Sequence, residues 1–317
     1  MNINQTISAL RKQLGFTQKD VSEGILSQSS YSRFERNEQS LSLEELEKIL
    51  DRMGIQMNDI NDLKQASNIH VAYIRKQIYS AFQGNLSNKE VVSLYFYSEE
   101  HKKESLMLLR YYYYIRQHFH THSEQIPALT SKDLNEIFTV ISRSKSLTSV
   151  YLQFIIDFTV HFTTPQLLHI INMYQNTEIP WGTAMDSTTN RLLPNLLSNI
   201  IDNLIDRAIV AKNEQDKQLL ELVPALLDQL KKALDILYSF NFSLLYKYSK
   251  LRYQFYVAAT VQERTNAETE IKTFIDHLTQ IIQITEIRNP YAESCKAGMI
   301  NLLESGIPKT SPWYIIN

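Results

Sequence analysis

The segment TQKDVSEGILSQSSYSRFERN, residues 17–37, contains two short helical patterns joined by a tight turn at Gly24. Thr17 is placed to cap the first helix, and Asp20, three residues later, completes a capping box. Ser27 is placed to cap the second helix. The spacing therefore predicts a helix–turn–helix unit near the amino end of the chain.

The second of these helices carries small polar side chains where a surface helix more often carries Glu and Lys. In a helix-turn-helix the second helix enters the major groove, where Gln pairs with adenine, Arg with guanine and Ser with either. Gln18, at the start of the preceding helix, is placed to bind a phosphate. We therefore predict a DNA-binding set of Gln18, Gln28, Ser29, Tyr31, Ser32, Arg33 and Arg36. The alternative is a helical hairpin with a polar outer face.

The apolar side chains of the same segment fit a packing role. Val21, Ile25, Tyr31 and Phe34 can fix the angle between the two helices. Further along, Ser42 begins another helix, and a fifth short helix begins near Asn58. Residues 1–65 thus read as five short helices.

The rest of the chain is poor in helix breakers. No glycine occurs between Gly84 and Gly182 or between Gly182 and Gly298, and the first proline is Pro127. Apolar residues recur every three or four positions, so we predict an all-α protein. Paired helices with short connections are typical of a tetratricopeptide-like α-solenoid, although no strict repeat consensus is present. The predicted helices span residues 68–83, 87–97, 99–119, 131–144, 147–162, 165–175, 189–211, 215–238, 241–261, 266–286 and 289–305.

The composition of the 317 residues excludes several classes of protein. A formal net charge of −2 gives no global basic field, so any DNA contact must come from a local patch. Cys295 is the single cysteine, which excludes an internal disulfide and disfavours a cysteine metal site. We find no apolar signal sequence after Met1 and no run of eighteen apolar residues. We expect a cytoplasmic protein without contact to a membrane.

Residues 6–60 resemble the Cro/phage-repressor type of helix-turn-helix. ISALRKQLGFTQKDVSEG matches its opening helix and Thr-Gln start, and SQSSYSRFERNEQSLSLEELEKILDRMGI matches its serine-rich recognition helix and Leu-rich fourth helix. The resemblance implies that Glu35 helps to fix the recognition helix and that Arg11 supports the fold or contacts the DNA backbone. Asn37 stands where glycine is usual, a mild departure because Asn tolerates the left-handed conformation.

The charge of this region is divided along the sequence. Residues 1–37 hold five basic and three acidic side chains, a net +2, whereas residues 38–65 hold three basic and seven acidic side chains, a net −4. The positive end is the one that would face DNA. Few phosphate contacts give weak binding by one copy, so we expect a homodimer on double-stranded DNA with two half-sites.

About 250 residues follow this head. An amino-terminal repressor-type head with an all-helical repeat domain, at this total length, is similar to the Rgg/PlcR/PrgX (RRNPP) group of peptide-pheromone receptors. The resemblance implies a quorum-sensing transcription regulator whose helical repeats bind a short signalling peptide. We therefore divide the chain into a DNA-binding domain at 1–66, a peptide-binding and dimerisation domain at 67–305, and a tail at 306–317.

Two helices carry candidate peptide-binding residues. In 189–211 a polar face includes Arg191, Asn195, Asn199 and Asn203, and asparagine can pair with an extended peptide backbone whatever its sequence. The resemblance supports this role, and a plain solvated face is the alternative. In 241–261 a shared side holds Tyr246, Lys250 and Tyr253, which could contact a peptide carboxylate and apolar side chains or could pack in the core.

The chain shows no motif for catalysis. We find no glycine-rich phosphate loop, H-E-x-x-H or serine elbow, and we predict no enzyme, cofactor or metal site. His118, His120 and His122 read as surface histidines at a helix end. Two other functions stay open: a phage or mobile-element repressor whose helical domain serves oligomerisation alone, and a helical scaffold for a protein partner.

Overall fold

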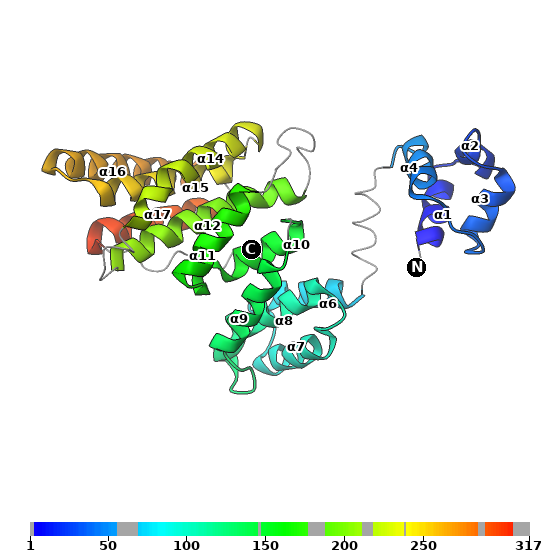
Figure 1. The fold of residues 1–317 in the computed structure, drawn as a ribbon, viewed down its shortest axis with the longest axis horizontal. Coiled ribbons are helices and arrows are strands. Elements are labelled where there is room, and N and C mark those ends of the chain that lie inside the picture. Colours follow the sequence, from blue (N-terminus) through cyan, green and yellow to red (C-terminus); the bar gives the residue numbers. More distant parts are fainter. Residues whose placement is uncertain are drawn as a thin grey trace. The chain divides into compact units, whose positions relative to one another are not determined.

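Every regular element in the described part of the chain is a helix, which confirms the all-α prediction (Figure 1). The computed structural model describes residues 3–55, 69–144, 147–176, 188–210, 218–237, 239–284 and 289–306. The chain divides into two compact units, Met1–Ala128 and Leu129–Asn317. The tail at 307–317 and the predicted fifth helix near Asn58 lie outside the described residues.

Four short helices form the amino-terminal head, residues 3–55. They are α1 (Ile3–Gln13), α2 (Gln18–Ser22), α3 (Gln28–Glu35) and α4 (Leu43–Arg52). The predicted caps are present: Thr17 and Asp20 form a capping box before α2, and the Ser27 hydroxyl accepts the backbone N–H of Ser30 at the start of α3. The helices enclose a core that includes Ile7, Val21, Tyr31, Phe34, Ile49 and Leu50.

The head is also closed by its connections. Asn37 adopts a left-handed conformation with φ of 65°, as its tolerance for that region predicts. Arg52, at the end of α4, donates to the backbone carbonyls of Asp20 and Glu23, at and just after the last turn of α2. The positive charge of Arg52 at this position also interacts favourably with the negative end of the α2 dipole. Arg52 therefore ties the end of α4 to the start of the turn between α2 and α3.

Three helices complete the first unit: α6 (Ile69–Phe82), α7 (Asn88–His101) and α8 (Leu106–Phe119). The predicted helix over 99–119 is wrong at its start, because α7 continues to His101 and Ser105 caps α8 by accepting the backbone N–H of Leu108. The run Tyr111–Tyr114 is buried. A 3-10 turn over His120–His122 follows α8, so these histidines do lie at a helix end.

The second unit stacks consecutive helices. These are α9 (Ser131–Ser142), α10 (Ser149–Phe158), α11 (Thr164–Gln175), α12 (Thr188–Val210), α14 (Val223–Leu237), α15 (Phe240–Val257), α16 (Val261–Ile284) and α17 (Pro290–Ser305). Neighbours such as α16 and α17 contact each other, and so do next neighbours such as α15 and α17 (Figure 1). This pattern of contacts is typical of a helical-repeat protein.

Helix α12 is the central helix of this unit. It packs against α10, α14 and α15, and its side chains from Leu196 to Ile205 are all buried. Its polar side does not reach solvent there, because Asp202 is covered by α15. The described ranges contain no helix with the length and apolarity needed to cross a lipid bilayer.

A buried ion-pair network joins α12 to α15. Arg252 is 1% exposed; its Nη1 donates to Asp202 Oδ1 over 2.8 Å and its Nη2 donates to Asp206. The Ser249 hydroxyl adds a 3.1 Å hydrogen bond to Asp202. Burial raises the pKa of Asp202, and the charge of Arg252 opposes that increase. The charge of Arg252 therefore stabilises the carboxylates of Asp202 and Asp206, and these carboxylates balance the charge of the buried guanidinium.

We predict that Arg252→Ala destabilises the second unit strongly, because it leaves the buried carboxylate of Asp202 and the half-buried carboxylate of Asp206 without their cation. The expected loss is about 3–5 kcal/mol, seen as a fall of roughly 10 °C in the thermal midpoint. Lys247→Ala is the control, because it removes a cation from α15 whose pair with Glu270 is exposed. Equal midpoints for the two variants would contradict the prediction.

Candidate functional site

Helix α3 presents one face to solvent and buries the other. At 100° per residue, Gln28, Ser29, Ser32, Arg33 and Arg36 fall within an arc of about 140°. Gln28, Ser29, Arg33 and Arg36 are exposed and Ser32 is half-buried. The structure therefore brings these five predicted DNA-binding residues together on one surface, which we call the reading face.

Tyr31 is a correction to the predicted DNA-binding set. It lies on the opposite side of α3, is 0% exposed and packs in the core beside Phe34. Burial raises the pKa of the Tyr31 hydroxyl. The side chain cannot reach a base without unfolding the head, so the DNA contact was wrongly predicted. The packing role also predicted for Tyr31 is confirmed.

The inner side of α3 is fixed by a charged hydrogen-bond network. Glu35 accepts from Arg11 at both carboxylate oxygens, over 2.6 and 3.0 Å, and Gln18 Nε2 donates to it over 2.8 Å. Arg11 Nη1 also donates to the carbonyl of Phe16 over 2.6 Å. Because Arg11 lies on α1 and Gln18 on α2, one carboxylate holds three helices in a fixed arrangement.

The electrostatics of this network favour the ionised pair. Burial raises the pKa of Glu35, but the hydrogen bonds from Arg11 and Gln18 and the charge of Arg11 lower it overall. The side chains of Arg11 and Glu35 are 8% and 6% exposed, so solvent screens the pair little. The Gln18 side chain therefore has an internal role in this structure, and its predicted phosphate contact stays a prediction.

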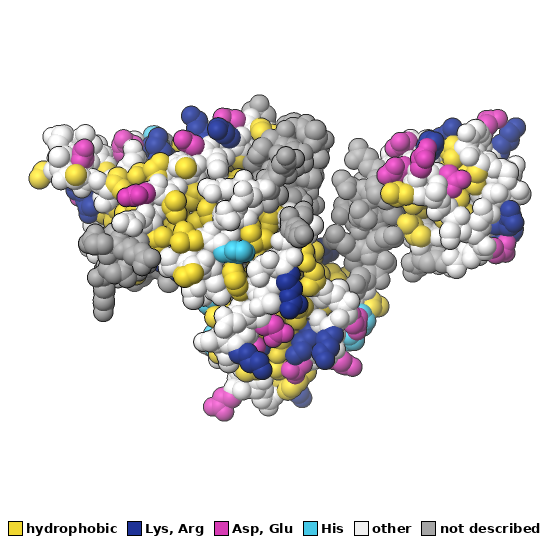
Figure 2. Space-filling model, viewed as in Figure 1, with side chains coloured by type: hydrophobic (Ala, Val, Ile, Leu, Met, Phe, Trp, Pro, Cys, Tyr) yellow, Lys and Arg dark blue, Asp and Glu magenta, His cyan; other side chains and the backbone are white. Residues whose placement is uncertain are grey.

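The reading face also carries part of the exposed positive charge of the head. Arg33 is exposed, and Arg36 forms an exposed pair with Glu38 at 2.9 Å that a phosphate can replace at little cost. Ser29 is held by a 2.9 Å hydrogen bond to Ser27. Figure 2 shows acidic side chains gathered over α4, and basic side chains with acidic neighbours along the edge at α2 and α3.

The predicted peptide-binding residues of α12 do not form one open face. Arg191 is exposed and Asn195 is half-buried. Asn199 and Asn203 are each 5% exposed; Asn199 donates to the carbonyl of Ile156 over 3.2 Å and Asn203 accepts from Arg207 over 2.9 Å. The open polar face was wrongly predicted for these two, because α10 and α15 both pack on that side of the helix.

The α15 candidates do share a side. Tyr246, Lys250 and Tyr253 are half-buried and lie opposite the face that α15 buries against α12 and α17. A shallow groove of about 190 Å³ lies nearby, between α15 and α16. Periodicity within one helix could not reveal it, because its lining joins two helices: Lys247, Thr269, Glu270, Thr273, Phe274 and His277.

Comparison with known proteins identifies the head and the fold. Residues 7–60 match the family described as Helix-turn-helix. No curated protein sequence matches the chain. Solved structures do match it over nearly its full length, and we describe three of them.

Rgg2, the SHP pheromone receptor of Streptococcus dysgalactiae, is 11% identical with a TM-score of 0.70, over 97% of this chain and 100% of its own. PrgX in complex with cCF10 is 16% identical with a TM-score of 0.63, over 98% of this chain and 94% of its own. ComR from S. thermophilus, in complex with DNA and its signalling peptide ComS, is 16% identical with a TM-score of 0.52, over 94% and 99%. This chain has the fold of these receptors.

We predict that Glu35→Gln loosens α3 at neutral pH, because Arg11 then stays buried without its anion. The expected loss of local stability is about 3 kcal/mol, measured by hydrogen exchange of the α3 amides in the full chain. Glu44→Gln is the control, because its pair with Lys48 is exposed.

Comparing the native chain with Glu35→Gln at low pH tests whether the loss of stability comes from the charge of Glu35. The folded-state pKa of Glu35 is lowered, so its contribution is full above the unfolded value of about 4.3 and is lost as the pH falls through the folded value. The difference between the native chain and Glu35→Gln should therefore shrink below about pH 4. A difference independent of pH would assign the effect to packing.

Proposed function

We propose that this chain is a DNA-binding transcription regulator controlled by a short signalling peptide that its helical repeats bind. One observation carries the proposal: a helix-turn-helix head with an exposed, polar reading face belongs to a chain that has the fold of three peptide-linked receptors over almost its entire length. The division of labour is a reading domain at 1–66, a peptide-binding and dimerisation domain at 67–305 and a tail at 306–317.

The head would read DNA with α3 in the major groove. Gln28 and Arg33 carry the donors and acceptors that base edges require, and Ser29 and Ser32 are short enough to let the backbone approach. The hydrogen bonds between Glu35 and Arg11 fix the orientation of α3. The reading face is therefore already oriented before DNA binds. Helix α3 thereby separates the residues that fold the head from those that would bind.

The small number of accessible cations on the reading face argues that two heads bind one operator. With Arg11 buried against Glu35, the reading face offers Arg33 and Arg36 to phosphate or base. Binding by one head would be weak, because each phosphate contact adds only one released counterion to the affinity. A homodimer doubles the contacts and fixes the half-site spacing. Such a regulator acts in the cytoplasm, where its DNA is.

The helical repeats would supply the sensor. PrgX is described with cCF10, and ComR with both DNA and the peptide ComS. In this chain Arg191 and Asn195 of α12, with Tyr246, Lys250 and Tyr253 of α15, are exposed or half-buried side chains that can contact a peptide. Asn199 would join them by exchanging the Ile156 carbonyl for a peptide carbonyl.

Control by the peptide requires two states of the protein. The peptide must bind one state more tightly, because equal affinities shift nothing. DNA affinity and peptide affinity are then coupled by the same factor in both directions. A quorum-sensing regulator of this kind responds when the peptide concentration reaches the dissociation constant of the preferred state.

A mobility-shift experiment tests the whole proposal. The probe is the DNA that flanks the gene for this chain, with and without synthetic peptides encoded by neighbouring short reading frames. We expect a shift that one peptide alters. A shift that no peptide alters would leave oligomerisation as the role of the repeats, and no shift on any flanking DNA would favour a protein-interaction scaffold.

We predict that Arg33→Ala and Gln28→Ala each weaken binding to that DNA by about 10-fold, since a lost base contact costs about 1–3 kcal/mol. Fluorescence anisotropy at two salt concentrations measures the loss of DNA affinity. If Arg33 binds a phosphate, the slope of log affinity against log salt concentration should fall in magnitude by about one in Arg33→Ala. Lys132→Ala, an exposed cation on α9, is the control. Unchanged affinity in both α3 variants would remove α3 from the interface.

We predict that Asn195→Ala weakens peptide binding by about 5- to 10-fold, the effect of losing one hydrogen bond of about 1 kcal/mol to the peptide backbone. Isothermal titration of the active peptide measures it. Asn172→Ala is the control, because Asn172 is an exposed asparagine on α11. Equal effects of the two substitutions would move the peptide away from α12.

A further inference from the structure

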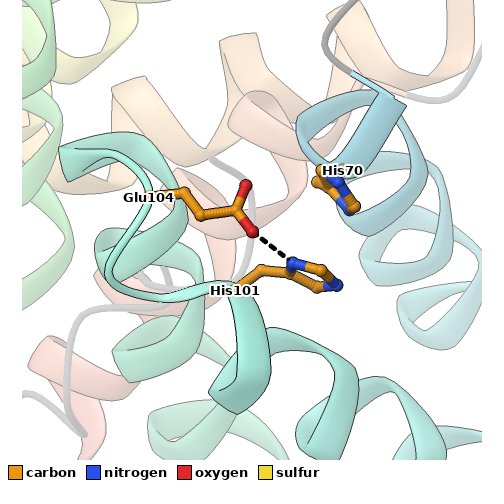
Figure 3. A group of neighbouring side chains, drawn as sticks. All are labelled: His70, His101 and Glu104. Carbon is orange, nitrogen blue, oxygen red and sulfur yellow. Dashed lines mark hydrogen bonds and ion pairs between the residues drawn. The ribbon is translucent and has the colours of Figure 1, made fainter.

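Three potential metal ligands converge in the first unit, and none of them belongs to the residues assigned above to DNA or peptide. His70 lies in the first turn of α6, His101 ends α7, and Glu104 lies in the turn before α8 (Figure 3). One ligand atom from each lies within 4.8 Å of the others. Within the described ranges, no other three His, Cys, Asp or Glu side chains converge this closely.

We propose that His70, His101 and Glu104 bind a divalent transition-metal ion such as Zn²⁺. Two imidazole nitrogens and one carboxylate oxygen are a donor set that Zn²⁺ accepts, and a water molecule completes four-coordination. Imidazole ligands also suit Cu²⁺ and Ni²⁺, whereas Mg²⁺ and Ca²⁺ prefer oxygen ligands. The site is thus selective by chemistry for transition metals.

The present geometry needs only side-chain movement to close on an ion. Metal–ligand bonds of about 2.0–2.2 Å put two ligands of a tetrahedral site about 3.4 Å apart. His101 Nδ1 and Glu104 Oε1 are 2.5 Å apart and would separate slightly around the ion. The His70 and His101 rings are stacked with their centroids 3.9 Å apart, so one ring must turn to direct its nitrogen at the same point.

Tyr97 is a partner that can orient His70. Its hydroxyl lies 2.6 Å from His70 Nδ1, and its ring packs 4.6 Å from that of His101. When Nδ1 carries the proton and donates to Tyr97, Nε2 is left with the lone pair that a metal needs. Metal-bound histidines commonly use their second nitrogen in this way, and the outer partner strengthens binding.

The histidine-rich stretch at the end of α8 lacks this arrangement. His120 Nδ1 lies 3.1–3.2 Å from the backbone carbonyls of Arg116 and Gln117, and His120 and His122 are exposed. These two residues therefore provide a matched control for unspecific binding of metal to surface histidines. A bound ion at His70 and His101 would, in contrast, join α6 to the end of α7 and stabilise the folded unit.

Titration of Zn²⁺ into the untagged, chelator-treated full chain tests the proposal. We expect one ion per chain and a higher thermal midpoint with metal. Tyr97→Phe keeps all three ligands and should weaken binding by about 10- to 100-fold; His70→Gln and His101→Gln should weaken it further. The double variant His120→Gln/His122→Gln should bind as the native chain does, and Mg²⁺ should not compete.

Two further measurements separate a folding defect from loss of the site. Glu104 is an exposed turn residue, so Glu104→Gln should fold and still bind Zn²⁺ more weakly. Co²⁺ substitution reports four-coordination through its visible absorption, which should vanish in His101→Gln. Native-like Zn²⁺ affinity in His70→Gln and Glu104→Gln, or equal loss in the His120/His122 variant, would overturn the proposal and leave surface binding alone.

Discussion

Buried arginines hold the helices of this chain together at the points where polar groups leave solvent. Arg11, Arg116 and Arg252 are each buried, and each binds carboxylates or backbone carbonyls that belong to another helix or to a loop. The guanidinium keeps its charge and offers five donors in one plane, so it can satisfy several acceptors at a single site. Removing one partner leaves the other charged and buried, which makes these contacts specific as well as stabilising.

The Arg11–Glu35 pair links this packing to the proposed function. It occupies the inner side of α3, so this packing does not use the exposed side chains of Gln28 and Arg33. Gln28 and Arg33 are then available for DNA without a cost in stability. In the second unit the polar residues are less clearly divided between packing and binding roles, because Asn199 and Asp202 of α12 take part in helix packing. A peptide surface that included Asn199 would therefore share that residue with the core.

Much of the fold could be predicted from the sequence. The helix starts marked by Thr17 and Ser27 agree with the structure because a cap forms within three residues of chain. The break before Ser105 was misplaced, since the apolar pattern runs on through α7 and α8. The predicted exposure of Tyr31 and Asn199 was wrong for another reason. The sequence of one helix does not show whether a second helix covers a polar or aromatic side chain on it.

The sequence by itself determined where several helices begin, that the described elements are helices, and which head the chain carries, because those properties depend on interactions within a few residues. Tertiary structure alone decided which polar groups meet. Arg11 finds Glu35 at a separation of 24 residues and Arg252 finds Asp202 at 50, and His70 meets His101 across two helices. No local pattern encodes such meetings, since they follow from the angles at which helices pack.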